Sequence, residues 1–475
     1  MMKVLGESLY QLVRRMHFRT RAVCCVTYAI AVVCVLQPIP IRSACFPQQL
    51  MQRLLGLTVY GVITMTTITG DQPRLFGDHF LADLDEDELA ILTRMRALSR
   101  DVFGPQAATV ASRDVFAWDT FRTLVDEGMI ATAFPRRYGG TDARQELRVR
   151  LIEEAGRVCS TTASLLTGAD LSARALVVGG SEKLKDEILP RLCKGEQQLA
   201  FGLSEPEAGS DVRGLQTRFR PQGDGYVIDG CKKFITRAGV ADWIVVVGQH
   251  EDTDRGFVAG LVARDTPGLS ISPEVGKLGW WGVPMNSLEL QGVRLPLSYR
   301  LGAEGEGFDL AQDALLRARI GHAAMALGRA IGAVEIASTY ACDRSAFGKS
   351  LGRHQGVQWM LAQMYTRIEA SRALVTMTAR KYDRNDADVA IYASMAKLDA
   401  TDLCMQVATD ALQLTGGRGY QKDFPLERFF RDAKLNQIGE GASEVHKTVI
   451  GRDVVRRAPK AERNPCLHSG SLVNY

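Results

Sequence analysis

The chain changes its hydrophobic periodicity twice, and the order of these changes limits the folds that it can adopt. Residues 84–200 repeat apolar side chains near the helical spacing, and the stretch from about 306 to 455 returns to that pattern. Between them come short runs rich in β-branched residues, separated by turn sequences such as QGDG and TPG. This order, with helices first, then strands, then helices, differs from the alternation of strands and helices that a parallel doubly wound sheet requires. We therefore predict an α+β, mainly α fold, with a helical domain over 84–200, a β domain over 201–300 and a helical domain over 306–455.

Two segments illustrate the helical patterns. In DEDELAILTRMRALSRDVF, acids lead, basic residues follow, and apolar side chains recur near the helical period at Leu89, Ile91, Leu92, Met95 and Leu98. The later segment LRARIGHAAMALGRAIGAVEIASTYACDR is small or apolar almost all round. A helix of that composition belongs in a protein core, so the sequence predicts a buried helix there.

Charge is distributed unevenly, and the basic excess lies at the N-terminus. The 475 residues include 58 Lys and Arg against 54 Asp and Glu; residues 1–65 hold seven Lys or Arg and one Glu, which leaves 51 against 53 in the rest. The body of the chain is therefore nearly neutral and has no charge excess that favours binding to nucleic acid.

The N-terminal extension, residues 1–64, allows three interpretations. Four arginines precede the apolar run AVCCVTYAIAVVCVL, which is shorter than the roughly 20 residues of a membrane span. The pattern resembles a signal peptide without a clear cleavage site, or an Arg-rich organellar presequence. We favour the third interpretation, in which translation begins at Met65 and the protein is cytoplasmic. The other two make it organellar or membrane-associated.

Several familiar catalytic motifs are missing from this sequence. The GKS at 348–350 has Asp343 where a phosphate-binding loop needs glycine, and GLSEP at 202–206 lacks the second glycine of a nucleophile elbow. The histidines form no HExxH motif, and the ten cysteines form no CxxC pair, so we expect no catalytic metal and reduced thiols. The tail, 456–475, is polar.

Six blocks along the body of the chain carry a resemblance. They are FGLSEPEAGSDVRGLQTRF (201–219), KKFITRAGVADWIVVV (232–247), YACDRSAFGKSLGRHQGVQ (340–358), QLTGGRGY (413–420), ERFFRDAKLNQIGEGASEVHK (427–447) and VIGRDVV (449–455). In order and spacing they resemble the acyl-CoA dehydrogenase family of flavoproteins, over about residues 84–455. The resemblance implies an N-terminal helical domain, a central β domain and a C-terminal four-helix domain, with FAD bound between them and a neighbouring subunit.

The resemblance also implies a set of cofactor contacts. Residues matching the family positions at the flavin ring are Leu203, Ser204, Phe234 and Thr236. Those matching the FAD diphosphate and adenosine side, or the later FAD-facing blocks, are Arg344, Phe347, Gln355, Gln413, Gly416, Gly417, Ala442 and Glu444. An Arg fork suits phosphate, and glycines let a backbone approach a cofactor closely.

Two glutamates stand four residues apart in the segment GEGASE, and the resemblance separates their roles. Glu440 falls on the family position that removes the α proton of an acyl thioester, and burial would raise its pKa toward the working pH. Glu444 is expected to begin the last helix, where its charge suits the positive helix end. A second family arrangement places the base on the buried helix before Arg319, but Ala318 stands there. Ser210 and Arg319 match substrate-contacting positions.

Two departures from the family pattern fall beside the base. Gly439 stands where many members have Tyr, and Ala442 where they have Thr. The missing Tyr ring predicts more room beside the reacting carbons, and hence a branched or bulky acyl group. The flanking Gly439 and Gly441 would let the backbone turn so that the Glu440 side chain and N–H both face the thioester.

The predicted function is FAD-dependent α,β-dehydrogenation of an acyl-CoA to the trans-2-enoyl-CoA. The resemblance further implies a homotetramer that passes electrons to an electron-transfer flavoprotein. One alternative is an oxidase or flavin-dependent monooxygenase of the same fold; Glu440 disfavours a hydroxylase, which needs no thioester base. Another is a non-catalytic scaffold, favoured only by the hydrophobic extension.

Overall fold

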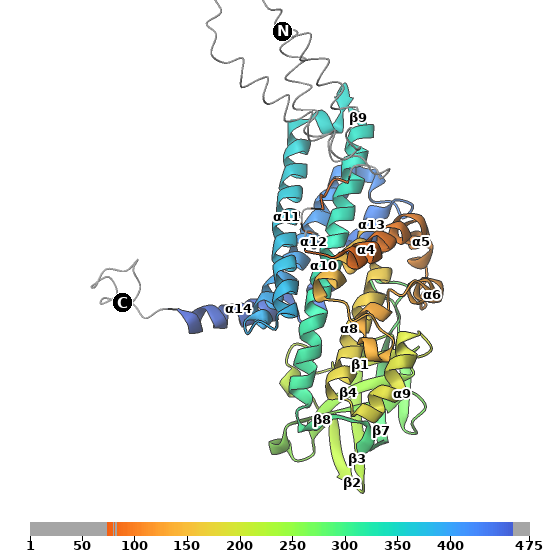
Figure 1. The fold of residues 1–475 in the computed structure, drawn as a ribbon. Helices are drawn as coiled ribbons and strands as arrows, with labels where there is room; N and C mark the ends of the chain where they lie inside the picture. The colour runs from red at the N-terminus through yellow and green to blue at the C-terminus, as the bar shows by residue number, and fades with distance from the viewer. Residues whose placement is uncertain (1–73, 79, 81–82, 459–475) are drawn as a thin grey trace, which may run out of the picture. The chain divides into compact units, whose positions relative to one another are not determined.

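The computed structural model describes residues 74–78, 80 and 83–458. The chain divides into two units, Met1–Arg74 and Leu75–Tyr475, and every element below belongs to the second unit (Figure 1). The predicted extension, 1–64, and residues 459–475 of the predicted tail lie outside the described residues. The predicted fold class, with helices first, then a β domain, then helices, is confirmed.

The first helical part precedes the sheet. Its helices are α4 (Glu86–Leu98), α5 (Gly104–Val110), α6 (Trp118–Asp126), α7 (Gln145–Val158), α8 (Ser160–Gly179) and α9 (Glu182–Cys193), with a π-helical turn at Ser99–Phe103. A capping box starts α4: the Asp85 carboxylate accepts from the Glu88 N–H, and the Glu88 carboxylate accepts from the Asp85 N–H. Of the predicted apolar stripe, Leu92, Met95 and Leu98 are buried. Leu89 is 37% exposed because it lies roughly 120° around the helix from the centre of the buried stripe.

A buried ion pair fixes α8 against α7. Arg148 donates both fork nitrogens to the two carboxylate oxygens of Asp170, at 3.1 and 2.8 Å, and neither side chain is exposed to solvent. Arg148 also donates to the Leu166 carbonyl at 3.0 Å. These contacts set the rotation of α8 and therefore decide which of its residues face the rest of the protein.

The β domain contains a mixed sheet of eight strands in the described part of the chain. They are β1 (Leu199–Gly202), β2 (Arg218–Gln222), β3 (Gly225–Thr236), β4 (Trp243–His250), β5 (Phe257–Ala263), β6 (Leu269–Glu274), β7 (Met285–Pro296) and β8 (Arg300–Gly305). The order is β6-β7-β3-β2-β4-β5-β8, and β1 pairs with β4. The strands β1 and β2 run parallel to β4, and the other pairs are antiparallel. The β-rich runs of the sequence form β3 to β7 in turn; they are YVIDG, DWIVVVG, GFVAGLVA, LSIS and SLELQGVRL.

The last part is built from long helices. They are α10 (Gly307–Asp343), α11 (Gln355–Asp383), α12 (Val389–Thr415), α13 (Pro425–Ile438) and α14 (Ser443–Arg457), with a small hairpin of β9 (Ser345–Ala346) and β10 (Lys349–Ser350) between α10 and α11. Among the described helices, α10 is long and apolar enough to cross a membrane, but 89% of its apolar window is buried inside the protein. The prediction of a buried helix in this segment is confirmed, and α10 is a core helix.

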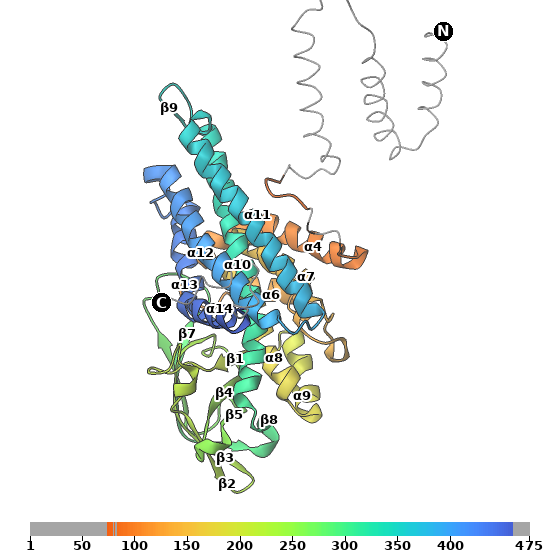
Figure 2. The same cartoon turned by 90° about the vertical axis from the view of Figure 1, so that its left-hand side faces the viewer.

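The helix α10 connects the sheet to the hairpin. One residue, Glu306, separates it from β8, and one residue, Arg344, separates it from β9. Its first part packs with α8 against the sheet, on β5 and β8, and α12 and α7 pack along it (Figure 2). At 37 residues it is roughly 55 Å long, so its two ends serve different parts of the molecule.

Candidate active site

Glu440 lies in the four-residue turn that joins α13 to α14. The α13 helix closes with a hydrogen bond from the Gly439 N–H to the Leu435 carbonyl at 2.9 Å. Glu440 then takes a left-handed conformation, with φ of 55°, and Gly441 follows at 96°. A Cβ on Gly441 would also lie 3.0 Å from Nε2 of His446, so glycine is required there for its conformation and for space.

Two cations lie around the Glu440 turn. The Arg319 Nε on α10 donates to the Glu440 backbone carbonyl at 3.4 Å, and the Lys397 Nζ on α12 donates to the Gly441 carbonyl at 2.6 Å. The Glu440 side chain is 18% exposed. Burial raises the pKa of its carboxyl, while the charges of Arg319 and Lys397 act in the opposite direction. The site therefore holds a partly desolvated carboxylate that two fixed cations keep able to ionise.

Two imidazoles complete the surroundings of the carboxylate. The Nε2 atom of His322 lies 3.8 Å from Oε1 of Glu440, and burial lowers the pKa of His322 to about 3, with Lys397 and Arg329 adding to the effect. Burial likewise lowers the pKa of His446 to about 4. Both rings are therefore neutral at neutral pH, and they contribute dipoles to the site without a further charge.

His322 lies beside Gly439, where the sequence predicts extra room. A Cβ built on Gly439 would lie 3.8 Å from Cε1 of His322. The room that a missing Tyr was expected to leave is thus bordered by an imidazole from α10. The sequence analysis missed His322, although it lies three residues after Arg319 and so on the same face of the helix. It also missed Lys397, because a buried lysine on a helix remote in sequence leaves no local pattern.

The predicted flavin segments lie side by side. Lys232, buried in β3, donates from Nζ to the Leu203 carbonyl at 2.9 Å and to Glu205 at 2.7 Å. The Lys233 N–H donates to the Ser204 carbonyl at 2.8 Å. Glu205 in turn accepts from the backbone N–H groups of Gln216 and Thr217 at 2.5 and 3.0 Å. This buried ion pair fixes the course of the loop after β1.

The end of β3 is irregular where the flavin contact is predicted. The pairing of β3 with β7 shifts register between Lys232 and Ile235, and Phe234 in this bulge has φ of 61°. Phe234 is 57% exposed, and Thr236 is exposed as well. The bulge therefore turns an aromatic ring and a hydroxyl away from the sheet.

The β domain reaches the C-terminal helices through the connection between β6 and β7. The Trp280 N–H donates to the Asp432 carboxylate on α13 at 2.7 Å, and its indole Nε1 donates to the Asp432 carbonyl at 3.0 Å. The Trp280 ring lies 5.7 Å from the His322 ring, centroid to centroid. This contact places the β domain beside the Glu440 turn.

The remaining predicted residues fall into separate places. Arg344 and Phe347 lie in or beside the β9–β10 hairpin, Gln355 begins α11, and Gln413, Gly416 and Gly417 lie at the end of α12; all six are exposed. Ser210, in the loop after β1, is exposed too, and Glu444 is an exposed residue in the first turn of α14. Ala442 caps the start of α14 without a side-chain hydrogen bond.

The structure does not bring the hairpin group to Glu440 within one chain. Arg319 contacts the Glu440 turn, whereas Arg344 lies 25 residues further along α10 at the other end of the helix. That separation is roughly 37 Å along the helix axis. A site that uses both groups therefore needs a second chain.

The residues of both groups suit a planar cofactor that carries phosphates. Phe347 is 96% exposed and, like Phe234, has a positive φ, here 52°. A Cβ on Gly416 or Gly417 would have no atom within 4 Å, so the backbone at both positions is open to a ligand. The exposed Arg344 supplies a phosphate-binding fork. Aromatic faces, hydroxyls, open backbone and an arginine are the chemistry that a flavin nucleotide requires.

Family models match almost the whole described chain. The N-terminal, middle and C-terminal domains of acyl-CoA dehydrogenase match residues 85–196, 200–293 and 305–455. The chain belongs to the acyl-CoA dehydrogenase family. Its similarity to the probable acyl-CoA dehydrogenase fadE25 of Mycobacterium leprae is 37% identity over 379 residues, which cover 79% of this chain and 97% of that protein.

Solved structures agree with this assignment. The butyryl-CoA dehydrogenase of Megasphaera elsdenii matches with a TM-score of 0.75 at 32% identity, covering 79% of this chain and 99% of that one. A structure of PigA with FAD and proline matches with a TM-score of 0.76 at 26% identity, covering 79% and 100%. The enzyme is an FAD-dependent oxidoreductase that dehydrogenates an acyl-CoA thioester, and the oxidase, monooxygenase and scaffold alternatives are not favoured.

Proposed function

We propose that Glu440 is the base that removes the α proton of the acyl-CoA. The observation that carries this proposal is the environment of its carboxyl, which burial pushes toward a higher pKa while Arg319 and Lys397 keep it able to ionise. A carboxylate tuned in this way is a more effective proton acceptor than one in water. Glu444, four residues on, is exposed, although its charge also acts on Lys397.

The backbone of the same residue is suited to polarise the thioester. Among the described residues, nothing accepts the Glu440 N–H, whereas its carbonyl is bound by Arg319. A donor without a partner beside the base can bind the thioester carbonyl oxygen and stabilise the negative charge that develops there. We propose that the left-handed turn at Glu440 lets its side chain and its N–H both face the thioester. When bound, FAD accepts the hydride that leaves the β carbon.

A flavin titration tests the role of Glu440. The FAD-loaded protein is mixed without oxygen with a panel of acyl-CoA thioesters, and loss of the flavin absorbance is followed for wild type, Glu440→Gln and, as the matched control, Glu444→Gln. We expect bleaching in wild type and in Glu444→Gln, and binding without bleaching in Glu440→Gln, with the bleaching rate reduced by at least about 1,000-fold. Equal rates in the two variants would refute Glu440 as the base.

We also propose that a second subunit completes each FAD site and that the assembly is a homotetramer. The support is the separation between Glu440 and the exposed Arg344 and Phe347 at opposite parts of α10. The mass of the FAD-loaded protein in solution tests the tetramer; a monomer that retains FAD and activity would exclude it.

The electron acceptor belongs to the same proposal. By its family, the enzyme would pass electrons to an electron-transfer flavoprotein, and slow oxygen consumption by the substrate-reduced enzyme is expected. Rapid peroxide release during turnover would favour an oxidase instead.

A further inference from the structure

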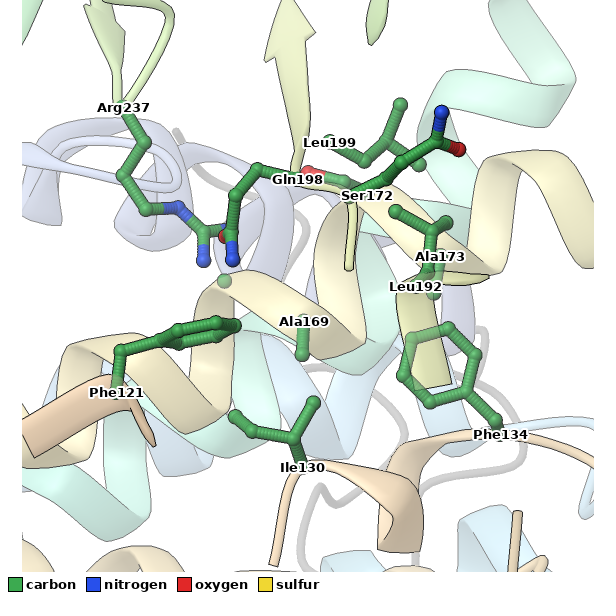
Figure 3. Close-up of a pocket in the computed structure, with 12 residues that line it drawn as sticks. Phe121, Ile130, Phe134, Ala169, Ser172, Ala173, Leu192, Gln198, Leu199 and Arg237 are labelled. Atoms are coloured by element: carbon green, nitrogen blue, oxygen red, sulfur yellow. The ribbon is translucent and has the colours of Figure 1, made fainter. Parts of the chain in front are cut away.

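A pocket lies between the first helical part and the β domain. Its lining is mostly apolar and comes from α6, the turns after it, α8, α9 and β1 (Figure 3). The apolar side chains include Phe121, Ile130, Phe134 and Leu192. The polar side chains are Ser172, Gln197, Gln198 and Arg237, and Figure 3 shows Arg237 reaching into the space across from Phe121 and Ile130.

Arg237 is a buried cation without a counter-charge. Its residue is 5% exposed, and no carboxylate or other described group pairs with its guanidinium. Burial lowers the pKa of Arg237 to about 10, so the side chain still carries its charge at neutral pH. An unpaired buried charge is costly, and Arg148, another deeply buried arginine, contrasts with it because Arg148 is paired with Asp170.

A second donor in the same pocket also lacks a partner. The Nε2 amide group of Gln198 is buried, and no described atom accepts its hydrogen atoms. Orphaned buried donors are rare in proteins, and two at one pocket indicate that an acceptor belongs between them. The acceptor must be an anion or carry several oxygen atoms, because both groups only donate here.

The chain is shaped to place the guanidinium in this pocket. A Cβ atom on Gly168 would overlap with the guanidinium of Arg237, so a side chain at this position of α8 would displace Arg237. Arg237 itself has φ of 67°, a conformation that L-residues with long side chains rarely adopt. Glycine in the middle of a helix and a left-handed arginine both cost stability, and strained residues of this kind gather at ligand sites.

Two pocket-lining residues, Arg237 and Gly168, have sequence neighbours that approach the proposed active site. Arg237 directly follows Thr236, a predicted flavin contact. Thr167, the neighbour of Gly168, lies within 3.1 Å of where a Cβ on Gly321 would be, and Gly321 precedes His322, which faces Glu440. These neighbouring residues connect the pocket lining to the surroundings of Glu440, and we place the far end of the acyl chain in this pocket on that basis.

Resting on the proposed function, we propose that Arg237 and Gln198 bind a carboxylate at the far end of the acyl chain. The substrate class is then a dicarboxylic acyl-CoA, whose methylene groups lie against the apolar wall and whose terminal carboxylate pairs with the guanidinium. A carboxylate matches the fork of an arginine and accepts from an amide at the same time.

Matched thioesters test this inference on the full chain loaded with FAD. Glutaryl-, adipyl- and suberyl-CoA are compared with the monocarboxylic thioesters of equal carbon number, pentanoyl-, hexanoyl- and octanoyl-CoA. The proteins are wild type, Arg237→Gln, Arg237→Lys and the control Arg220→Gln, which changes an exposed arginine on β2. We expect wild type to prefer one dicarboxylic thioester. The KM ratio of that thioester to its monocarboxylic partner should rise about 10- to 100-fold in Arg237→Gln, rise less in Arg237→Lys, and stay unchanged in Arg220→Gln.

A binding measurement separates the possible failures. Glu440→Gln holoenzyme, with and without Arg237→Gln, is titrated with the same thioesters, and the dissociation constants are read from the flavin spectrum. Tighter binding of the dicarboxylic thioester that is lost with Arg237→Gln supports the inference. Bleaching of wild type by monocarboxylic thioesters alone, or a KM ratio that Arg237→Gln does not change, overturns the inference and leaves the dehydrogenase intact. Binding of thioesters without bleaching of wild type by any of them refutes the proposed function instead.

Discussion

At the scale of single residues, the proposed active site depends on the ionisation of one carboxyl. The pKa of Glu440 is raised by burial and lowered by Arg319 and Lys397. The pKa of Glu440 is therefore higher in the folded protein than in the unfolded chain. As the pH rises from the unfolded pKa to the folded pKa, Glu440 lowers the free energy of unfolding. The Glu440→Gln protein should therefore be at least as stable as wild type at neutral pH, so its inactivity cannot be ascribed to unfolding.

Lys397 should set the acidic limb of the pH profile. Its charge favours the ionised form of Glu440, so removing it in Lys397→Met should raise the pKa of Glu440 and move the acidic limb of kcat/KM by roughly one unit to higher pH. Lys434→Met, an exposed lysine on α13, is the matched control and should leave the limb in place. A limb that stays fixed in Lys397→Met would mean that the lysine acts only through its hydrogen bond to Gly441.

Arg237 should cost stability when no ligand is present. Replacing an unpaired buried charge by an apolar side chain of similar length removes its desolvation penalty, so Arg237→Met should raise the free energy of unfolding by about 1–3 kcal/mol. Urea unfolding of the ligand-free holoenzyme measures this change. A clear loss of stability would show that the guanidinium has a structural partner.

The sequence analysis selected Glu440 because a whole family pattern surrounds it. In the structure Glu440 lies in a partly buried turn and Glu444 is exposed, while the role of Glu440 as the base stays a prediction. His322, Lys397 and Arg237 were not predicted as site residues. Each of these three residues is far from Glu440 in the sequence. Each was also recognised by its burial, which is a property of the folded chain. No local spacing distinguishes a buried lysine from an exposed one.

At the scale of elements, the order of helices and strands could be predicted because hydrophobic periodicity is a local property. The β-rich runs of the sequence form the strands β3 to β7 in turn. The sheet order could not be predicted, because strand pairing joins segments far apart in the sequence. The pairing of β1 with β4, for example, places Leu199 opposite Trp243. The bulge that exposes Phe234 could not be predicted either, because it depends on the pairing of β3 with β7.

The pair of Lys232 and Glu205 should control the loop after β1. Glu205→Gln would leave Lys232 buried without a full counter-charge, and we expect a loss of about 3–5 kcal/mol in the free energy of unfolding together with weaker FAD retention. The double variant Glu205→Leu, Lys232→Met removes both charges and should recover part of the stability. A double variant that is no more stable than the single one would contradict the assignment of the loss to an unpaired buried Lys232.

At the scale of the whole molecule, the proposed shared FAD site can be tested by mixing subunits. Arg344→Ala and Glu440→Gln subunits are each expected to be inactive alone. Co-expressed with two different tags and purified through both, they should form some sites with Glu440 from one chain and Arg344 from the other. Random mixing restores about a quarter of the sites. Activity that stays absent in a mixed, FAD-loaded oligomer would place the complete site within one chain.

The 37 residues of α10 have a consequence for how this enzyme can change during evolution. Arg319 and His322, in the first half of the helix, contact the Glu440 turn, and the C-terminal end presents the hairpin that the neighbouring chain is expected to use. Inserting a single residue between Arg319 and Asp343 would advance the hairpin by roughly 1.5 Å and rotate it by roughly 100° about the axis. Substitutions along α10 can accumulate one at a time, but its length cannot drift in the same way. In the proposed assembly, α10 sets the distance between the base of one site and the hairpin that the neighbouring site uses, so its residue count should be among the most invariant properties of the protein.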